Sequence, residues 1–491
     1  MSPCDFQQPA PDRSDVVRFF PCVLMIMCLQ SVVTANDARI SRPNIVLILV
    51  DDLGKEWVSC YGAEDIQTPR VDQLAAEGMQ FDNFYVMPQC TPTRLTLLTG
   101  QYPFRHGWVN HWDVPRWGGG CHYDWKRNPC MATVMKKAGY STAIAGKWQI
   151  NDFRVQPNAM TEMGFDEYCM WTGGEGRNPP SQERYWNPYI HTTDGSRTYD
   201  GEFGPDVYAG FLLDFIRRKK DEPFFVCFPM ALTHGPLVTT PDEPDVTGDL
   251  AKHKAMVRYT DQILGRFVDT LNELQIREKT IIIWTTDNGT AGGITGHRNG
   301  RAVAGQKSNS VEPGVCMPMI VSAPGLVPQG IRTDALADLT DLLPTFAELA
   351  GTQPQSGFVY DGTSFAQLLT GRAQDSGRSW IMAMGGKNEA RLTDKGVENR
   401  YVFRDRVLRE KRFKLFVDTQ RRPSALYDMI ADPTESSNLI GSSDLQAQAA
   451  LQRLFALVDQ FPGRDNDPIY TPLPPQPWDV KISAQSQVWK E

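Results

Sequence analysis

Residues 44–52 read NIVLILVDD, in which six consecutive apolar side chains lead directly into two adjacent aspartates. An apolar run without alternation is typical of a strand that is buried on both faces of a parallel sheet. Polar side chains at the carboxyl end of such a strand lie where α/β sheets bind their ligands. This stretch therefore predicts an α/β fold and marks one edge of its sheet as a candidate functional site.

The rest of the chain alternates between helix-like and strand-like segments. We expect helices over residues 71–77, 131–138, 207–219 and 250–274, and strands over residues 141–145, 224–228 and 280–285. Alternation of this kind favours a sheet covered by helices on both faces. After Gly371 the pattern changes to short strands at 380–384, 401–403 and 413–417 and a helix at 444–459. These segments predict a smaller C-terminal α+β unit with an antiparallel sheet.

Composition and the N-terminus limit the class of protein. The 491 residues are 41% hydrophobic and 22% charged, as in ordinary globular proteins, and the net charge of −8 argues against a nucleic-acid partner. An apolar run from Phe19 to Ala35 ends in small side chains, the pattern of a secretory signal peptide. We expect residues 1–35 to be this signal and the protein to be exported, periplasmic or extracellular, without stable membrane insertion once the signal is removed.

The cysteine count is unusual for an exported protein. Three of the ten cysteines fall in the leader and seven follow it, so at least one of the seven is not in an intramolecular disulfide. Cys121 and Cys130 could pair across a short loop. Cys90 is then the natural candidate for a different chemical fate.

Oxygen-bearing side chains follow two of the expected strands. Asp51 and Asp52 end the first, and Asp287 and Asn288 end the strand at 280–285. Carboxylate and amide oxygens are hard ligands that suit Ca²⁺ or Mg²⁺ and not zinc. The alternative is that each aspartate only caps a turn, as isolated aspartates commonly do. Two such strand ends in one sheet favour a cation site.

The residues around Cys90 carry a resemblance to a known family. CTPTR at residues 90–94, continued to Leu98-Thr99-Gly100, resembles the signature of the type I, formylglycine-dependent sulfatases of the alkaline-phosphatase-like superfamily. Further similarity follows in the family's order, in AGKW at 145–148, THGP at 233–236, TDNG at 286–289 and GQK at 305–307. The resemblance implies a large mixed, mostly parallel sheet sandwiched by helices. It also implies a catalytic domain over residues 42–370, and a smaller C-terminal subdomain and tail over residues 371–491.

The same resemblance implies how the site would work. A maturation enzyme would oxidise Cys90 to formylglycine, whose hydrate would attack the sulfur of a sulfate ester. One Ca²⁺ per chain would be held by Asp51, Asp52, Cys90 in its modified form, Asp287 and Asn288. Arg94 and Lys147 would steady the nucleophile. His234 and Lys307 would bind the sulfate group, and His234 would protonate the leaving alcohol.

One residue departs from the family pattern. Gln149 stands where the family commonly has a histidine that helps the intermediate to collapse, and an amide cannot act as a base near neutral pH. His106 or His111 could take over that task. Two other functions stay open. One is a phosphate or phosphonate ester hydrolase of the same superfamily, because the nucleophile and the metal can serve either anion. The other, which Gln149 suggests, is a catalytically impaired protein that binds sulfated glycans.

The loop from Tyr102 to Trp125 bears on the substrate. It interleaves four tryptophans with histidines and Arg116, a composition that suits stacking on sugar rings and equally suits packing within a long loop. An exported sulfatase meets sulfated polysaccharides readily, so a sulfated carbohydrate is the preferred substrate class.

Overall fold

The computed structural model describes residues 42–109, 123–175, 178–386, 390–393 and 396–468, together with Met1 and Pro477. The expected leader, residues 110–122 of the tryptophan-rich loop and almost all of the C-terminal tail lie outside the described residues. The chain from Arg42 onward forms one compact unit. No described helix combines the length and the apolarity needed to cross a membrane.

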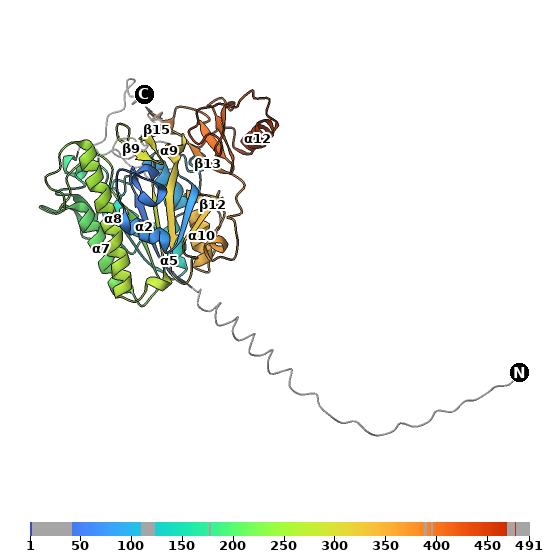
Figure 1. Ribbon diagram of the computed structural model, residues 1–491. Helices are drawn as coiled ribbons and strands as arrows, with labels where there is room; N and C mark the ends of the chain where they lie inside the picture. The colour runs from blue at the N-terminus through green and yellow to red at the C-terminus, as the bar shows by residue number, and fades with distance from the viewer. Residues whose placement is uncertain are drawn as a thin grey trace. The chain divides into compact units, whose positions relative to one another are not determined.

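A ten-stranded sheet forms the centre of this unit (Figure 1). Its spatial order is β12-β2-β11-β8-β1-β7-β3-β4-β5-β6. The strands are β1 (Asn44–Val50), β2 (Met79–Tyr85), β3 (Ser141–Lys147), β4 (Glu167–Trp171), β5 (Tyr189–Thr192), β6 (Gly195–Thr198), β7 (Phe224–Pro229), β8 (Thr280–Thr286), β11 (Cys316–Ser322) and β12 (Ile331–Asp338). The central strands β8, β1, β7, β3 and β4 pair in parallel, whereas β11, β5 and β6 pair antiparallel to their neighbours. The predicted mixed, mostly parallel sheet is confirmed.

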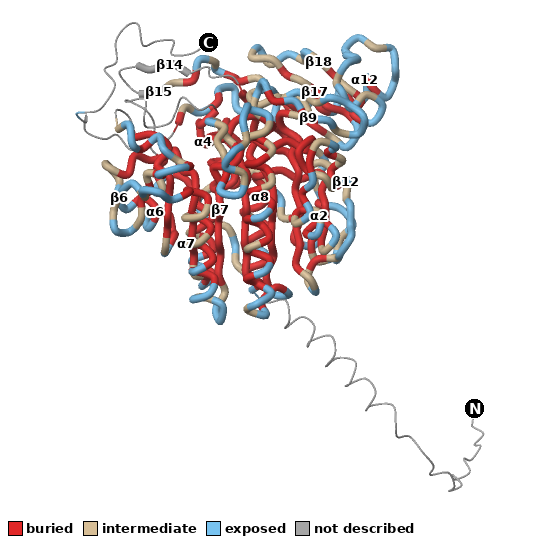
Figure 2. The backbone as a smooth tube through the Cα atoms, turned by 60° about the vertical axis from the view of Figure 1, so that its left-hand side comes forward, coloured by how far each residue is buried: buried red, intermediate tan, exposed pale blue. Residues whose placement is uncertain are grey.

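Alternate side chains of β1 pack on opposite faces of the sheet, which explains the continuous apolar run. Ile45, Leu47 and Leu49 join one hydrophobic cluster, and Val46 and Ile48 join the other. Helices α3 (Cys90–Thr99), α5 (Met131–Lys137) and α10 (Leu342–Leu349) supply the first cluster. Helices α2 (Pro69–Ala76), α7 (Gly204–Lys219) and α8 (Asp249–Glu273) supply the second. Figure 2 shows the buried backbone running through the middle of this layered arrangement.

The C-terminal segments form a second, antiparallel sheet. Its order is β13 (Ile381–Met384), β16 (Arg406–Arg409), β17 (Phe413–Val417) and β18 (Pro423–Asp428), and α12 (Leu445–Ala456) packs against β17 and β18. The strand expected at residues 401–403 is wrong. That segment bends, because the amide N–H of Arg404 donates to the Asp465 carboxylate and the Val402 carbonyl accepts from the Asp465 amide, in place of ladder bonds.

Three further groups of elements complete the described chain. The short helices are α4 (Pro103–His106), α6 (Ala159–Glu162), α9 (Glu312–Val315) and α11 (Ala366–Leu369). Two small hairpins are built from β9 (Thr295–Arg298) with β10 (Arg301–Ala304), and β14 (Ala390–Thr393) with β15 (Gly396–Asn399). Single turns of 3₁₀ helix lie at Lys55–Trp57, Ser59–Tyr61, Pro179–Gln182, Arg277–Lys279, Leu339–Asp341 and Leu457–Gln460.

Candidate active site

The register of β1 and β8 brings the two acidic strand ends together. Val50 pairs with Thr286 in the parallel ladder, so the next residues, Asp51 and Asp287, leave the sheet side by side. The Asp287 amide donates to the Val50 carbonyl at 2.9 Å, which continues the ladder by one bond. Lys147, the last residue of β3, reaches the same end of the sheet.

Helix α3 begins at this edge with Cys90 as its first residue. Pro92 is tolerated there because amides in the first helical turn have no intrahelical partner. The Thr93 hydroxyl donates to the Asp287 carbonyl at 2.7 Å, which ties the start of the helix to the end of β8. Gly100 ends the helix with φ 64, and its amide donates to the Thr96 carbonyl. The sulfur of Cys90 is thereby held at a fully buried helix N-terminus beside two carboxylates.

Two buried cations hold the first pair of carboxylates. Lys147 Nζ lies 2.5 Å from Asp51 Oδ2, and both side chains are fully buried. Arg94, one turn after Cys90, contacts Asp287 at 2.8 Å and Asp51 at 3.3 Å. The family resemblance predicted that these residues would meet, and the structure brings them together.

The second part of the site centres on Asp52. Lys307 Nζ contacts its two carboxylate oxygens at 2.6 and 2.8 Å, and Asn288 Nδ2 donates to Oδ1 at 2.7 Å. The Asp52 amide donates to Asp287 Oδ1 at 3.1 Å, which joins the two halves of the site. His234 Nε2 lies 3.8 Å from Asp52 Oδ2. All the residues predicted from the motifs thus converge on one location.

The oxygen atoms that remain in this cluster fit a hard cation. Asp51 Oδ1 and Asn288 Oδ1 are buried and have no hydrogen-bond partner among the described residues. Donor atoms of Asp51, Cys90 and Asp287 lie within 4.8 Å of one another, as do those of Asp51, Asp52 and His234. Unpaired buried oxygens are costly unless a cation or a donor satisfies them. The donor set therefore suits Ca²⁺ or Mg²⁺, with the thiol of Cys90 as its one poor ligand.

The carboxylates cannot easily all be ionised at once. Burial, together with the nearby charge of Asp51, raises the pKa of Asp287 to about 7. Burial also raises the pKa of Asp52, and Asp51 adds to this against the opposing charge of Lys307. For Asp51, burial is outweighed by Lys147, His234 and Arg94, which hold its pKa well below the usual value. A bound divalent cation would favour the ionised form of all three.

His234 has surroundings that the motifs did not predict. Its Nδ1 lies 2.6 Å from the Gly235 carbonyl and 3.1 Å from Arg184 Nη1, so one tautomer satisfies only one of these contacts. Burial, with the charges of Lys307 and Lys147, lowers the pKa of His234 well below its ordinary value. Arg184 also stacks over the ring of Trp171 at 4.1 Å. Sequence reasoning missed Arg184, because no motif or periodicity distinguishes it from other surface arginines.

Gln149 occupies the place beside Cys90. Its Oε1 lies 3.7 Å from the Cys90 sulfur, and its backbone has φ 84. A Cβ at Gly173 would lie 2.4 Å from Gln149 Cγ, so a glycine is needed for this close packing. His106 instead contacts Thr96 Oγ1 and the Trp108 amide, and burial lowers its pKa to about 3. The other suggested substitute, His111, lies outside the described residues.

The described parts of the tryptophan-rich loop favour packing. Trp108 is fully buried and Trp125 packs against the same hydrophobic cluster. Trp112, Trp117, His122 and Arg116 lie outside the described residues, as does Cys121. Cys130, its suggested disulfide partner, is a buried free thiol.

Comparison with known proteins assigns the family. The Sulfatase family model matches residues 43–352, and the model for the C-terminal part of N-sulphoglucosamine sulphohydrolase matches residues 306–459. The fold and the family model agree with the resemblance seen in the motifs. The chain belongs to the sulfatase family.

Relatives with assigned names are sulfatases. N-acetylgalactosamine-6-sulfatase of Canis lupus familiaris is 31% identical over 67% of this chain, and the match spans 66% of that enzyme's length. N-acetylgalactosamine-6-O-sulfatase of Bacteroides thetaiotaomicron is 28% identical over 85% of this chain and 93% of its own. The crystal structure of Ps i-CgsB superposes with a TM-score of 0.70 at 23% identity, covering 88% of this chain and 95% of that one, and shows the shared fold.

Proposed function

We propose that this protein is an exported sulfatase that hydrolyses sulfate esters of a carbohydrate. One observation carries the proposal: Cys90 sits at the N-terminus of α3, with its sulfur and carboxylate oxygens of Asp51 and Asp287 within 4.8 Å of one another. A cysteine is a poor partner for a hard cation, whereas the oxygens of a hydrated formylglycine at the same position are good ones. The membership of the chain in the sulfatase family supports that modification.

The charges of the site favour an anionic substrate. Three carboxylates, Asp51, Asp52 and Asp287, are matched by three cations that contact them: Arg94, Lys147 and Lys307. A divalent cation therefore leaves an excess of positive charge in a buried site. The partial positive charge at the N-terminus of α3 adds to it. A sulfate ester bound against Cys90 would neutralise this excess.

The proposed roles follow from these contacts. Lys147 and Arg94 fix the carboxylates around the nucleophile at position 90, and Lys307 and His234 face the bound sulfate group. His234 Nε2 can pass a proton to the leaving oxygen in the tautomer in which Nδ1 accepts from Arg184 and Nε2 carries the proton. A Ca²⁺ held by Asp51, Asp52, Asp287, Asn288 and the modified Cys90 would supply Lewis-acid polarisation of the nucleophile and of the sulfate.

Two further assignments belong to the proposal. The signal peptide at residues 1–35 would export the protein, and residues 42–370 and 371–491 would be the catalytic domain and the C-terminal subdomain. The substrate class is supported by the relatives, which are named for the 6-sulfate of N-acetylgalactosamine. A sulfated amino sugar is therefore the first substrate to assay.

Release of inorganic sulfate tests the proposed function. Protein co-expressed with a formylglycine-generating enzyme is expected to release sulfate from N-acetylgalactosamine 6-sulfate or a longer sulfated oligosaccharide, measured by ion chromatography. Faster release of phosphate from the matching phosphate ester would favour the phosphate or phosphonate hydrolase. Tight binding of the sulfated sugars with no product, from protein whose formylglycine is verified, would favour the glycan-binding alternative.

Gln149 is expected to contribute to turnover as a hydrogen-bond acceptor. Gln149→Ala removes the oxygen that lies 3.7 Å from the Cys90 sulfur. Loss of one such hydrogen bond lowers kcat by about 10-fold. Gln149→His should keep most of the activity. Histidine tolerates a positive φ, and its ring nitrogen can accept a hydrogen bond in place of the glutamine oxygen.

Steady-state kinetics of both variants on the same substrate checks this role. Gln367→Ala is the matched control, since this exposed glutamine bonds to Glu348 away from the site. A Gln149→Ala enzyme with unchanged kcat would show that the amide makes no contact that matters for the reaction.

A further inference from the structure

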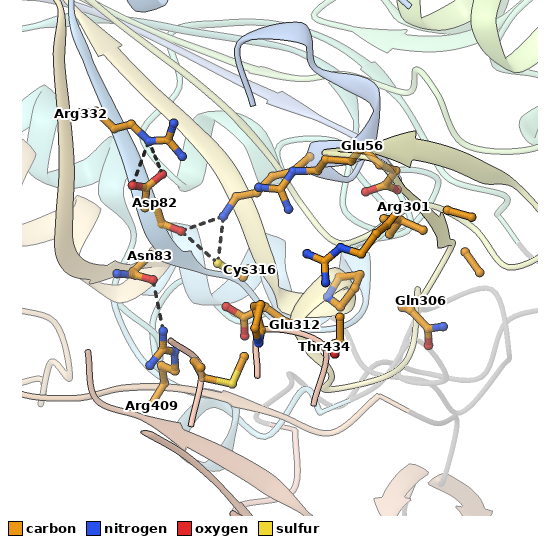
Figure 3. A pocket seen from close by; sticks show the side chains of 18 residues that line it. Glu56, Asp82, Asn83, Arg301, Gln306, Glu312, Cys316, Arg332, Arg409 and Thr434 are labelled. Atoms are coloured by element: carbon orange, nitrogen blue, oxygen red, sulfur yellow. Dashed lines mark hydrogen bonds and ion pairs between the residues drawn. The ribbon is translucent and has the colours of Figure 1, made fainter. Parts of the chain in front are cut away.

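A pocket of about 400 Å³ lies outside the cluster around Cys90 (Figure 3). Its walls come from hairpin β9–β10, from strand β2, and from the C-terminal sheet at the end of β16. Five cations line it: Lys55, Arg298, Arg301, Arg332 and Arg409. Only three carboxylates do so, those of Glu56, Asp82 and Glu312. This excess of positive charge stands out in a chain whose net charge is −8.

Hairpin β9–β10 places two arginines next to each other. Its turn is Asn299-Gly300 with φ 51 and 74, and both values are positive as a type I′ turn requires. Arg298 and Arg301 flank the turn and are register partners, so their side chains project from the same face of the hairpin. Like charges directly opposite each other destabilise a two-stranded ribbon. An anion bound between the two guanidinium groups would reverse that repulsion.

Several of the cations have no carboxylate partner among the described residues. Lys55, which is largely buried, donates to the Asp82 carbonyl at 2.7 Å and to the Cys316 sulfur at 3.0 Å. Burial raises the pKa of the Cys316 thiol to about 11, so its sulfur does not neutralise this lysine. Arg301 is exposed and forms no ion pair with an acidic group in the part of the chain that the structure describes, and Arg298 donates from Nε to the Tyr61 carbonyl.

Arg409, the last residue of β16, lines the pocket from the side of the C-terminal sheet. It is buried, donates to the Glu410 carbonyl and to Asn83 Oδ1 at 3.5 Å, and leaves its Nε without a hydrogen-bond partner. Figure 3 shows its guanidinium pointing toward Asn83 from the C-terminal segment. The charge of Arg409 also acts on Glu312, but its buried Nε has no partner among the described residues and can donate to a ligand anion.

The lining carboxylates are already engaged by other groups. Arg332 Nε donates to both carboxylate oxygens of Asp82, at 2.9 and 3.0 Å. Burial would raise the pKa of Glu312, but Lys414 and Arg409 lower it to about 2, and Lys414 contacts it at 3.2 Å. Burial raises the pKa of Glu56, which bonds to Thr290. Among the described residues, these acids form no ion pair with Lys55, Arg298 or Arg301, although the charges of Lys55 and Arg298 still act on Glu56 at longer range.

We propose that this pocket binds an oxyanion, a sulfate or phosphate group, between Arg298, Arg301 and Lys55. Its volume admits a ligand of about one sugar residue, since small-molecule pockets span about 300–1,000 Å³. Arginine is suited to two-pronged recognition of such groups. Gln306 lines the pocket, and the next residue, Lys307, contacts Asp52 in the active site. The oxyanion could therefore be a second sulfate group of the substrate or a separate small anion.

Isothermal titration calorimetry with sodium sulfate at constant ionic strength measures the affinity of the pocket for sulfate, and it requires no turnover. The background is a Lys307→Ala protein, in which sulfate binding at the active site is weakened. Arg301→Glu is the pocket variant, because this exposed side chain can change without disturbing the core. Arg422→Glu is the matched control, an exposed arginine that contacts Asp418 in the turn between β17 and β18. We expect Arg301→Glu to weaken sulfate binding at least 10-fold and Arg422→Glu to leave it unchanged.

Equal sulfate affinity in the Lys307→Ala protein with and without Arg301→Glu would overturn the proposal. A second measurement, which rests on the proposed function, identifies the source of the anion. If the pocket binds substrate, Arg301→Glu in the otherwise intact enzyme raises KM about 10-fold for a disulfated sugar and leaves KM for the monosulfated sugar unchanged. If calorimetry shows the loss and neither KM changes, the ligand is a separate anion. If the protein does not turn over sulfate esters, the calorimetric result still stands. The proposed function and the proposed anion pocket can therefore be rejected independently of each other.

Discussion

Replacing Cys90 by alanine is expected to abolish release of sulfate, lowering kcat by about 10⁴-fold or more, as the loss of a nucleophile does. Cys90 begins α3, with its sulfur near oxygens of Asp51 and Asp287, and no other described cysteine joins these carboxylates in a potential metal-binding group. The alanine side chain is smaller than that of cysteine, so the helix can form unchanged. We expect the variant to fold and to keep its affinity for the sulfated sugar, because Lys307 and His234 remain.

Two measurements accompany this variant. Mass spectrometry of the wild-type peptide that contains position 90 should show the thiol-bearing side chain replaced by an aldehyde, in protein made with the maturation enzyme. Cys60→Ala is the matched control, since this half-buried thiol belongs to neither potential metal-binding group and the variant should retain full activity. Fully active enzyme carrying only unmodified cysteine at position 90 would rule out the formylglycine mechanism.

The convergence of the site could be predicted because strand ends and short motifs encode it. The run at residues 44–50 identifies a strand buried on both faces, and a parallel neighbour ending in Asp287 must then place its carboxylate next to Asp51. The position of Lys147 could be predicted for the same reason, because Lys147 is the last residue of β3 in the same sheet. The motifs around Cys90 and His234 added the family resemblance, which periodicity alone does not supply.

Other features depend on contacts between segments that are distant in sequence. Arg184 contacts His234 from a position 50 residues earlier in the sequence. The position of Gln149 depends on its positive φ and on the missing Cβ of Gly173. The strand expected at 401–403 was lost to hydrogen bonds with Asp465, more than 60 residues away. Local propensity cannot register such bonds, because they arise only when the chain has folded.

Removing the proposed cation is expected to abolish turnover and to lower the thermal stability of the folded protein. Without a cation, Asp51, Asp52 and Asp287 crowd in one buried site, and Asp51 Oδ1 and Asn288 Oδ1 have no partner among the described residues. Ca²⁺ at a concentration 1,000 times its Kd would stabilise the fold by about 4 kcal/mol. Dialysis against a chelator should therefore lower Tm by several degrees and eliminate sulfate release, and added Ca²⁺ should restore both.

Variants separate a true ligand effect from general weakening of the fold. Asn288→Ala removes one of the unpaired oxygens, so it should need a higher Ca²⁺ concentration, at least 10-fold, to reach half of its maximal activity. Asp206→Asn is the matched control, because this carboxylate pairs with Arg266 away from the site and should leave the Ca²⁺ requirement unchanged. Full activity in a protein shown by elemental analysis to contain no metal would contradict the assignment. The oxygens of Asp51 and Asn288 would then need another partner, and Asp287, whose pKa is raised to about 7, would be partly protonated at neutral pH.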